Sequence, residues 1–351
     1  MARNAKYTEV MAVIERRIRQ GDYLLDVVPG ERTIAAETGV SHMTARKAVQ
    51  ALISKKVLKR AAGGGLQVNP HYQSTEQVAQ IVMLYPAYPS PFLTQLRQTM
   101  ALATREHGME LRPVQYVHWD DPVVMDAVSH RGGTIVIPSS SDVPDRVVQA
   151  MRAGKCVSLD IDLSHHDIKS IRLYPDAHVR EVFRHLKKLG HKKINCISTH
   201  TKNAEVKRRI KLWRDWIKRE GLEGELWENP APSFNDPTPY AHEMMLKQLK
   251  SGDLKGTAVV GTTFPAALGA TRACWEQGLT VGRDISICAV NIESPARFMT
   301  PGIAGLDIPD LSAILERCFG WFLQDEAWDE PRLLEPKRSA FFRGESADIK
   351  T

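Results

Sequence analysis

Apolar residues in the first 70 positions of the chain recur at helical spacing and then give way to short strand-like runs. Residues 7–20 repeat apolar residues three and four positions apart, which predicts an amphipathic helix. After a turn-rich break, residues 31–39 predict a short helix that ends at Gly39. Ser41 has the chemistry of an N-cap for a third helix, which reaches about Lys55. The apolar stripe of this third helix consists of Ala45, Ala48, Val49 and Leu52.

Two short strands are predicted on either side of a glycine triplet at 63–65. The order helix, helix, turn, helix and hairpin is that of a winged helix-turn-helix. The next segment, "NPHYQSTEQ" at 69–77, is polar, contains a proline and has no periodicity. We therefore expect a head at residues 1–69, a linker at 70–77 and a body at 78–351.

Strands rich in Val and Ile alternate with amphipathic helices from residue 79 onward. This alternation predicts parallel sheets that are covered by helices on both faces. Residues 78–351 are too many for one sheet, so we expect two similar lobes with a cleft between them. Ligands of such sheets bind at the carboxyl ends of the strands. The predicted fold class is α/β, with an N-terminal winged helix-turn-helix and a two-lobed body of parallel sheets flanked by helices.

The net charge of +6 belongs entirely to the head. Residues 1–70 contain 12 Lys and Arg against 6 Asp and Glu, whereas the other 35 basic and 35 acidic residues cancel. A basic module on a neutral body predicts that the module binds a polyanion and that the body has a separate task.

The sequence argues against several other classes of protein. Five cysteines are scattered among apolar neighbours, which predicts reduced, mostly buried thiols in a cytoplasmic protein. No apolar run approaches the length of a membrane helix, and the first ten residues lack the core of a signal peptide, so we expect no membrane contact. There is no P-loop, HExxH or G-x-S-x-G motif. We therefore expect no enzyme, catalytic residue, cofactor or metal site.

Residues 41–55 have the properties of a helix that reads DNA. The free N–H groups and the dipole at a helix N-terminus favour a phosphate there, and the apolar stripe lets the preceding helix hold this one. Short donors and cations lie on its leading or exposed side, namely Ser41, His42, Thr44, Arg46 and Lys47. A solvated basic face is the alternative explanation, but the spacing of the whole module and its isolated charge favour DNA. We expect the glycine-rich hairpin tip to reach an adjacent minor groove.

The segment "PGERTIAAETGVSHMTARKAVQALISKKVLKRAAGGGLQV" resembles the DNA-binding domain of GntR-type bacterial regulators. This resemblance implies DNA contacts by residues of the second helix, the third helix and the wing, namely Arg32, Thr44, Arg46, Gly64 and Gly65. Two positions depart from the family pattern, because Gly30 stands where Ser is usual and His42 where Arg is usual. Histidine is a weaker and pH-sensitive donor, so we expect an operator that differs from the family norm.

The body is similar to the family of the lac repressor and the ribose-binding protein. The similarity is carried by "SLDIDLSHHDIKSIRLYPDAHVREVFRHLKKLGHKKINCIST", "VGRDISICAVN" and "FFRGES". The join of a GntR-type head to this body resembles the arabinose-repressor type of regulator. The resemblance implies a periplasmic-binding-protein-like fold, two lobes that close on a sugar, a dimer, and DNA affinity that changes with ligand.

Polar and aromatic residues at strand ends and loop starts are the candidate ligand contacts. They are Tyr88, Ser90, Phe92, Ser139, Asp160, Arg209, Phe264 and Asn291. The resemblance gives Asp160 the place of a ligand-facing acid and Arg209 that of a clamp at a helix start. Asn291 and the pair Thr263 and Phe264 stand where the family commonly has acids, so a common hexose or pentose is less strongly indicated, and Phe264 is a candidate to stack on a ring.

Each candidate also has an ordinary explanation. A strand-end Asp often caps the next helix, as Asp160 could, and Arg209 lies in the basic run "KRRIK", where a solvated cation is common. Phe92 and Phe264 are of a residue type that belongs more often to a core than to a pocket.

We therefore predict a transcription regulator, a repressor, whose affinity for DNA is controlled by a sugar or sugar derivative bound between the lobes. A homodimer would present two heads to a pseudo-palindromic site in double-stranded DNA. The alternative is a constitutive DNA-binding regulator whose body has lost the ligand switch and serves for dimerisation or protein contacts. A solute scavenger that does not act on DNA is disfavoured, because it would not need the basic head.

Overall fold

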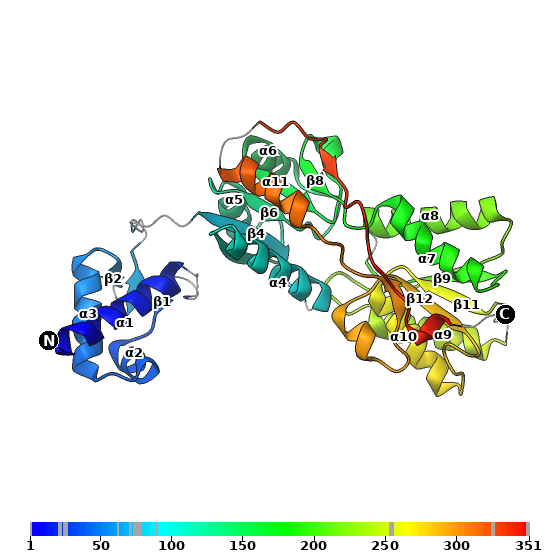
Figure 1. Ribbon diagram of the computed structural model, residues 1–351, viewed down its shortest axis with the longest axis horizontal. Coiled ribbons are helices and arrows are strands. Elements are labelled where there is room, and N and C mark those ends of the chain that lie inside the picture. Colours follow the sequence, from blue (N-terminus) through cyan, green and yellow to red (C-terminus); the bar gives the residue numbers. More distant parts are fainter. Residues whose placement is uncertain are drawn as a thin grey trace. The chain divides into compact units, whose positions relative to one another are not determined.

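The computed structural model describes residues 2–19, 23, 27–61, 63–69, 72, 79–88, 90–201, 203–252, 256–323 and 327–348 (Figure 1). The chain divides into two compact units, residues 1–80 with 104–112 and residues 81–103 with 113–351. Apart from residue 72, the predicted linker at 70–77 lies outside the described residues, and its bounds stay a prediction. No helix in the described part of the chain is long and apolar enough to span a membrane.

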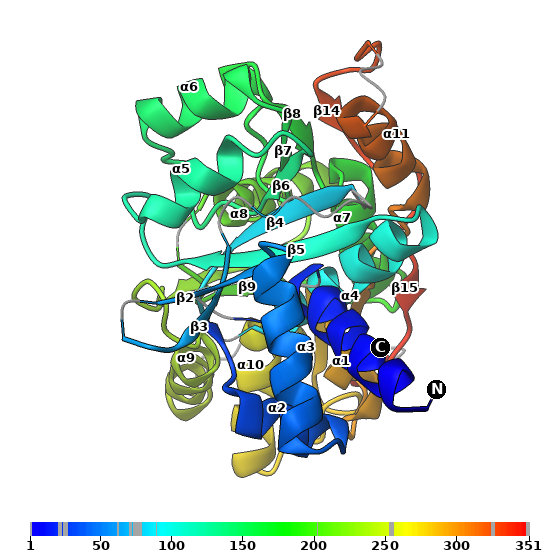
Figure 2. The same ribbon diagram turned by 90° about the vertical axis from the view of Figure 1, so that its left-hand side faces the viewer.

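The head consists of three helices and a small antiparallel sheet in the order β1-β3-β2. Its elements are α1 (Ala2–Arg19), β1 (Val27–Val28), α2 (Glu31–Thr38), α3 (His42–Ser54), β2 (Leu58–Arg60) and β3 (Leu66–Val68). Helix α3 contacts both α1 and α2 (Figure 2). The predicted winged helix-turn-helix is confirmed. Strand β1 was not predicted, because the sequence of this stretch indicates a turn-rich break.

The ends of the head helices follow from their sequence. The Ser41 side chain accepts a hydrogen bond from the backbone N–H of Thr44 at 3.2 Å, so it caps α3 as predicted. Gly39 ends α2 in the left-handed conformation, with φ at 65°. The stripe of α3 predicted to be apolar and inward is fully buried and packs on residues of α1 and α2 such as Ile14 and Ile34.

The first lobe of the body is built on a six-stranded sheet in the order β14-β8-β7-β6-β4-β5. Its strands are β4 (Gln80–Pro86), β5 (Glu110–Tyr116), β6 (Thr134–Val136), β7 (Cys156–Leu159), β8 (Lys169–Ile171) and β14 (Leu333–Leu334). Its helices are α4 (Pro91–Glu106), α5 (Pro122–Val128), α6 (Asp145–Ala153) and α11 (Ser312–Leu323), and a short 3-10 turn, η2, spans Ser164–His166. The short helix α5 and the late helix α11 were not predicted.

The second lobe contains a sheet in the order β10-β9-β11-β12-β13-β15, which is parallel except for the antiparallel pair of β13 and β15. Its strands are β9 (Ile194–Ser198), β10 (Leu226–Glu228), β11 (Ala258–Gly261), β12 (Ser286–Asn291), β13 (Ala304–Leu306) and β15 (Phe341–Phe342). Helices α7 (Asp176–Lys188) and α8 (Ala204–Glu220) cover one face of the sheet, and α9 (Thr238–Lys250) and α10 (Phe264–Glu276) cover the other (Figure 1). Two further 3-10 turns are η3 (Ser294–Phe298) and η4 (Glu345–Ala347).

The predicted α/β fold with a two-lobed body is confirmed. The chain passes between the lobes after β8, after β13 and after β14, so neither lobe is one continuous segment. All five cysteines are buried and unbonded, as expected for reduced thiols. Because the central strands of both lobes are parallel and enclosed by helices, their carboxyl ends provide the edges on which a site can form.

Candidate functional site

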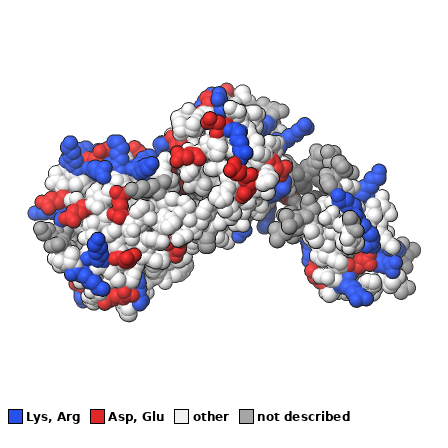
Figure 3. Space-filling model, turned by 180° about the vertical axis from the view of Figure 1, so that it is seen from behind, with Lys and Arg blue, Asp and Glu red and all other residues white. Residues whose placement is uncertain are grey.

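The predicted DNA-reading residues lie on the exposed side of the head. Arg32, Ser41, His42, Arg46, Lys47, Gly64 and Gly65 are exposed, and Thr44 is half-buried. The Thr44 hydroxyl lies 2.9 Å from that of Ser41, so both belong to the N-terminal turn of α3. Figure 3 shows Lys and Arg side chains over the visible face of the head, with acidic side chains towards its lower part. Ser41, His42 and Thr44 therefore lie at the N-terminal end of α3, and Arg46 and Lys47 follow within the same helix.

Two of the predicted residues have contacts within the head. The Lys47 ammonium lies 4.4 Å from the ring centre of Tyr7, so its side chain reaches α1. The His42 ring nitrogen is 3.8 Å from the carboxylate of Glu31, which also forms an ion pair with Arg60 of β2 at 3.1 Å. Glu31 thus connects the start of α2 to the hairpin. Within the described residues, Arg32 and Arg46 have no ion-pair partner, which leaves their guanidinium groups available to phosphates or bases.

The tip of the hairpin between β2 and β3 requires glycine at one position. Gly64 has a φ of 81°, in the left-handed region that disfavours other residues. A side chain there would meet open space, so the constraint comes from the backbone alone. The backbone N–H of Ala61 donates to the carbonyl oxygen of Gly65 at 2.8 Å and closes the turn. The tip is therefore narrow and without side chains, as a wing that enters a groove needs to be.

The body contains a cavity of about 360 Å³ that residues of both lobes line. All eight predicted ligand residues line it: Tyr88, Ser90, Phe92, Ser139, Asp160, Arg209, Phe264 and Asn291. They come from the ends of β4, β6, β7, β11 and β12 and from the first two turns of α4, α8 and α10. The rule that ligands bind at carboxyl ends of parallel strands therefore located one shared cavity.

Arg209 is buried, with 5% of its surface exposed, so it is not the solvated cation that the basic run equally suggested. It lies in the second turn of α8, because that helix begins at Ala204, whereas the resemblance places Arg209 at a helix start. One terminal nitrogen donates to the Asn291 side-chain oxygen and to the Thr262 carbonyl oxygen, both at 2.7 Å. Arg209 thus joins the ends of β11 and β12, and two predicted ligand contacts are in contact with each other.

Asp160 follows β7 with a φ of 74°, an uncommon conformation for a residue other than glycine. Burial raises the pKa of its carboxyl group to about 6, although the guanidinium of Arg209 acts in the opposite direction. The neighbouring Asp162, and not Asp160, accepts a hydrogen bond from the backbone N–H of Ser164 at the next turn. Asp160 is therefore a cavity carboxyl group and not a helix cap.

The remaining candidates have mixed roles. The Ser90 hydroxyl accepts a hydrogen bond from the backbone N–H of Leu93 at 3.3 Å and so caps α4. The backbone N–H of Ser139 donates to the hydroxyl of Tyr116 at 2.8 Å. Phe264 is 3% exposed and belongs to the core of the second lobe as well as to the cavity wall. Phe264 therefore belongs both to the core and to the cavity wall.

Several cavity residues were not identified from the sequence. The most important is Glu293, which is 5% exposed and lies two residues beyond the end of β12. Burial, with a contribution from nearby Asp236, raises the pKa of its carboxyl group to about 7. His200 and Phe234 also line the cavity, and burial lowers the pKa of His200. Glu293 is an acid near a strand end, which is the same sequence signal that identified Asp160. Among the described residues, no three metal-binding side chains come together.

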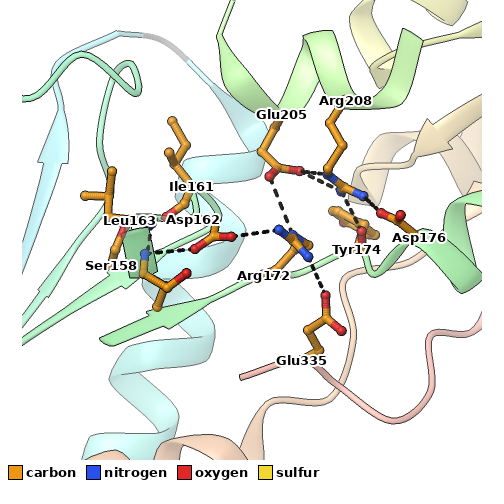
Figure 4. A network of polar contacts seen from close by, with 12 residues as sticks. Ser158, Ile161, Asp162, Leu163, Arg172, Tyr174, Asp176, Glu205, Arg208 and Glu335 are labelled. Carbon is orange, nitrogen blue, oxygen red and sulfur yellow. Dashed lines mark hydrogen bonds and ion pairs between the residues drawn. The ribbon is translucent and has the colours of Figure 1, made fainter. Parts of the chain in front are cut away.

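A network of ion pairs lies where the chain crosses between the lobes (Figure 4). Arg172, just after β8, contacts Asp162 of the first lobe at 2.8 Å and Glu335 after β14 at 2.7 Å. It also lies 3.8 Å from the cavity residue Glu205 on α8, which pairs with Arg208 at 2.6 Å. These contacts connect two crossing segments to both lobes. A change in the angle between the lobes would therefore have to rearrange this network.

Comparison with known protein families matches the two parts of the chain separately. The model of bacterial regulatory proteins of the gntR family matches residues 6–68, and that of the periplasmic binding protein-like domain matches residues 183–310. The chain therefore joins a GntR-type winged helix-turn-helix domain to a periplasmic-binding-protein-like domain. The predicted combination is confirmed.

Individual relatives resemble either the GntR-type head or the body of this chain. The HTH-type transcriptional regulator GgaR of Escherichia coli is 38% identical over 66 residues, which are 18% of this chain and 26% of that regulator. A lac repressor dimer bound to operator and an anti-inducer covers 78% of this chain and 95% of its own, with a TM-score of 0.64 and 19% identity. A LacI-family regulator from an Arthrobacter species, in complex with lactose, covers 77% of this chain and 99% of its own, with a TM-score of 0.63 and 14% identity.

These likenesses give the chain the head of GntR-type regulators and a body with the fold of the Lac repressor. The identities in the body are low, so they show its fold alone.

Proposed function

We propose that this protein is a transcription regulator, a repressor, whose affinity for DNA is controlled by a small polar molecule bound between the lobes of its body. The observation that carries the proposal is the combination of an exposed α3 and glycine wing with a cavity lined by both lobes in the same chain. A ligand that contacts both lobes favours one arrangement of them over another, and a shift between arrangements can be transmitted to attached heads.

The head supports DNA as the partner. The N-terminus of α3 carries short donors at Ser41 and Thr44, and Arg46 is exposed beside them. Main-chain N–H groups and an arginine at a helix N-terminus are suited to phosphates and to guanine edges. The named lac repressor structure is a dimer bound to operator. By analogy, we propose a homodimer that places two heads on a two-fold symmetric site in double-stranded DNA.

The cavity supports a polar ligand, for which a sugar or a sugar derivative is our first proposal. Arg209 Nε and Thr263 Oγ1 are buried and have no hydrogen-bond partner among the described residues, and both residues line the cavity. Buried polar atoms are rarely left without a partner, so a ligand with several hydroxyl groups would satisfy them. Phe92 and Phe264 offer apolar rings for the C–H face of such a molecule.

The test is a selection of bound fragments from the DNA of the source organism, carried out with the full chain and with Arg46→Ala. The proposal predicts a two-fold symmetric site that is enriched by the wild-type chain and depleted with the variant. A selection in which neither protein enriches any site would refute DNA recognition. If the site is found and a broad panel of sugars and sugar derivatives leaves its affinity unchanged, the constitutive alternative replaces the ligand switch.

A further inference from the structure

The cavity between the lobes has an excess of negative charge. Its acidic lining residues are Asp160, Glu205, Asp236 and Glu293. Its basic lining residues are Arg209 and His200. Burial lowers the pKa of His200, so this side chain is uncharged near neutral pH and Arg209 is the cation that remains among the described lining residues. A ligand that enters this cavity therefore meets more anions than cations.

Two of the four acids already face cations. Glu205 pairs with Arg208 at 2.6 Å and lies 3.8 Å from Arg172. Asp160 lies in the field of the Arg209 guanidinium, which favours its ionised form against the effect of burial. Glu205 is therefore already paired, and Arg209 offsets part of the cost of burying Asp160.

Glu293 lacks such a partner. It is 5% exposed, and within the described residues its side chain forms no hydrogen bond or ion pair. Burial and, to a smaller extent, the negative charge of Asp236 raise the pKa of Glu293. Burial, then Asp160, then Glu293 raise the pKa of the Tyr88 hydroxyl. Asp236 and Tyr88 both line the cavity and belong to different lobes. The carboxyl group of Glu293 therefore points into the cavity, desolvated and beside a second negative group.

Aromatic rings complete this end of the cavity. The rings of Tyr88 and Phe234 meet edge to face with their centres 6.1 Å apart, and each comes from a different lobe. Phe234 holds a φ of 67°, which is a strained conformation for a bulky residue and brings its ring to this position. Aromatic faces next to carboxylates form the usual environment of an organic cation. A bare metal ion would make no use of these rings.

We propose that the effector carries a positively charged nitrogen, as an amino sugar does, and that this nitrogen binds between Glu293, Asp236 and the rings of Tyr88 and Phe234. This inference rests on the proposed function, because it names the class of molecule that operates the switch. A neutral sugar would form hydrogen bonds with the polar groups of the cavity, but by displacing water it would favour the uncharged form of Glu293 and gain nothing from its charge. A cation replaces that water with an opposite charge.

The test separates a metabolite extract of the source organism on a strong cation-exchange resin at pH 7 into a retained pool and an unretained pool. Each pool is titrated into the full chain, and tryptophan fluorescence reports binding to the body. The proposal predicts that the retained pool contains the activity. It also predicts that Glu293→Gln needs about tenfold more of that pool for the same response, whereas Glu243→Gln, at an exposed acid on α9, behaves as wild type.

The outcomes distinguish this inference from the function on which it rests. Activity in the unretained pool, or an unchanged response of Glu293→Gln to the retained pool, would overturn the cationic effector and leave a ligand-controlled regulator. If neither pool changes the fluorescence or the affinity for a selected DNA site, the ligand switch itself is refuted and the inference falls with it.

Discussion

Replacing Glu293 with Gln should make the ligand-free body more stable at neutral and alkaline pH. The side chain is buried, and no described cation pairs with it. Glutamine has nearly the same shape and no charge, so Glu293→Gln removes the desolvated anion without opening a space. The substitution therefore isolates the free energy that the charge costs.

The size of the effect follows from the pKa of Glu293, which is about 7 in the folded protein and 4.5 in an ordinary glutamate. One pKa unit corresponds to about 1.36 kcal/mol, so the ionised carboxylate lowers the free energy of unfolding by about 3 kcal/mol. Below pH 4.5 the group is protonated in both the folded and the unfolded chain and contributes no difference. Between that pH and about 7 the folded protein holds the proton more tightly, so the free energy of unfolding falls as pH rises. Above this window the full cost is present.

Urea unfolding followed by tryptophan fluorescence measures this effect in the body, because all seven tryptophans lie at position 119 or later. The difference in free energy of unfolding between Glu293→Gln and wild type should grow by about 3 kcal/mol in favour of the variant from pH 4.5 to pH 8. Because the two proteins share every other titratable group, the contributions of those groups to the free energy of unfolding cancel in the difference. Glu243→Gln, at an exposed site, should show no such trend. A difference that is independent of pH, or that favours the variant only in acid, would refute the assignment of Glu293 as a desolvated, unpaired acid.

Three further predictions concern the head and the cavity. Arg46→Ala should weaken binding to a selected DNA site by about 1–3 kcal/mol, as measured by fluorescence anisotropy. The control is Arg16→Ala, at an exposed cation on α1. Equal affinities of the two variants would remove Arg46 from the recognition surface. Arg209→Ala should abolish the response of DNA affinity to the active metabolite pool, because the substitution removes the group that joins β11 to β12. The DNA affinity in the absence of the pool should stay unchanged. An intact response would exclude Arg209 from the switch. Gly64→Ala should lower the free energy of unfolding of the head by about 1–2 kcal/mol through its left-handed backbone, as judged by circular dichroism. Gly63→Ala, in equally open space and without a positive φ, should have little effect, and equal losses at both positions would contradict a backbone origin.

The head was largely predictable because its signals are local. The capping of α3 by Ser41 and the end of α2 at Gly39 depend on residues a few positions apart, and the apolar stripe of α3 repeats with the helical period. Strand β1 was missed because Val27 and Val28 are too few to show an alternation. Their place is fixed by pairing with β3, about 40 residues later in the chain.

The cavity was predictable in its location but not in its internal contacts. The eight residues predicted from strand ends and loop starts all line one cavity. The sequence could not show that one nitrogen of Arg209 donates a hydrogen bond to Asn291, since the two residues are 82 positions apart. It also could not rank Glu293 above other acids, because the property that distinguishes Glu293 is burial without a partner, and burial is a property of the folded body.

The measurement that tests the account most directly is the affinity of the full chain for its selected DNA site, with and without the metabolite pool that binds the body. A coupling between the cavity and the head predicts a change of at least about fivefold in that affinity. The same change should be lost in Arg209→Ala. If the pool binds the body and the affinity for DNA stays the same, the cavity and the head act independently, and the central claim of a ligand-controlled regulator is wrong.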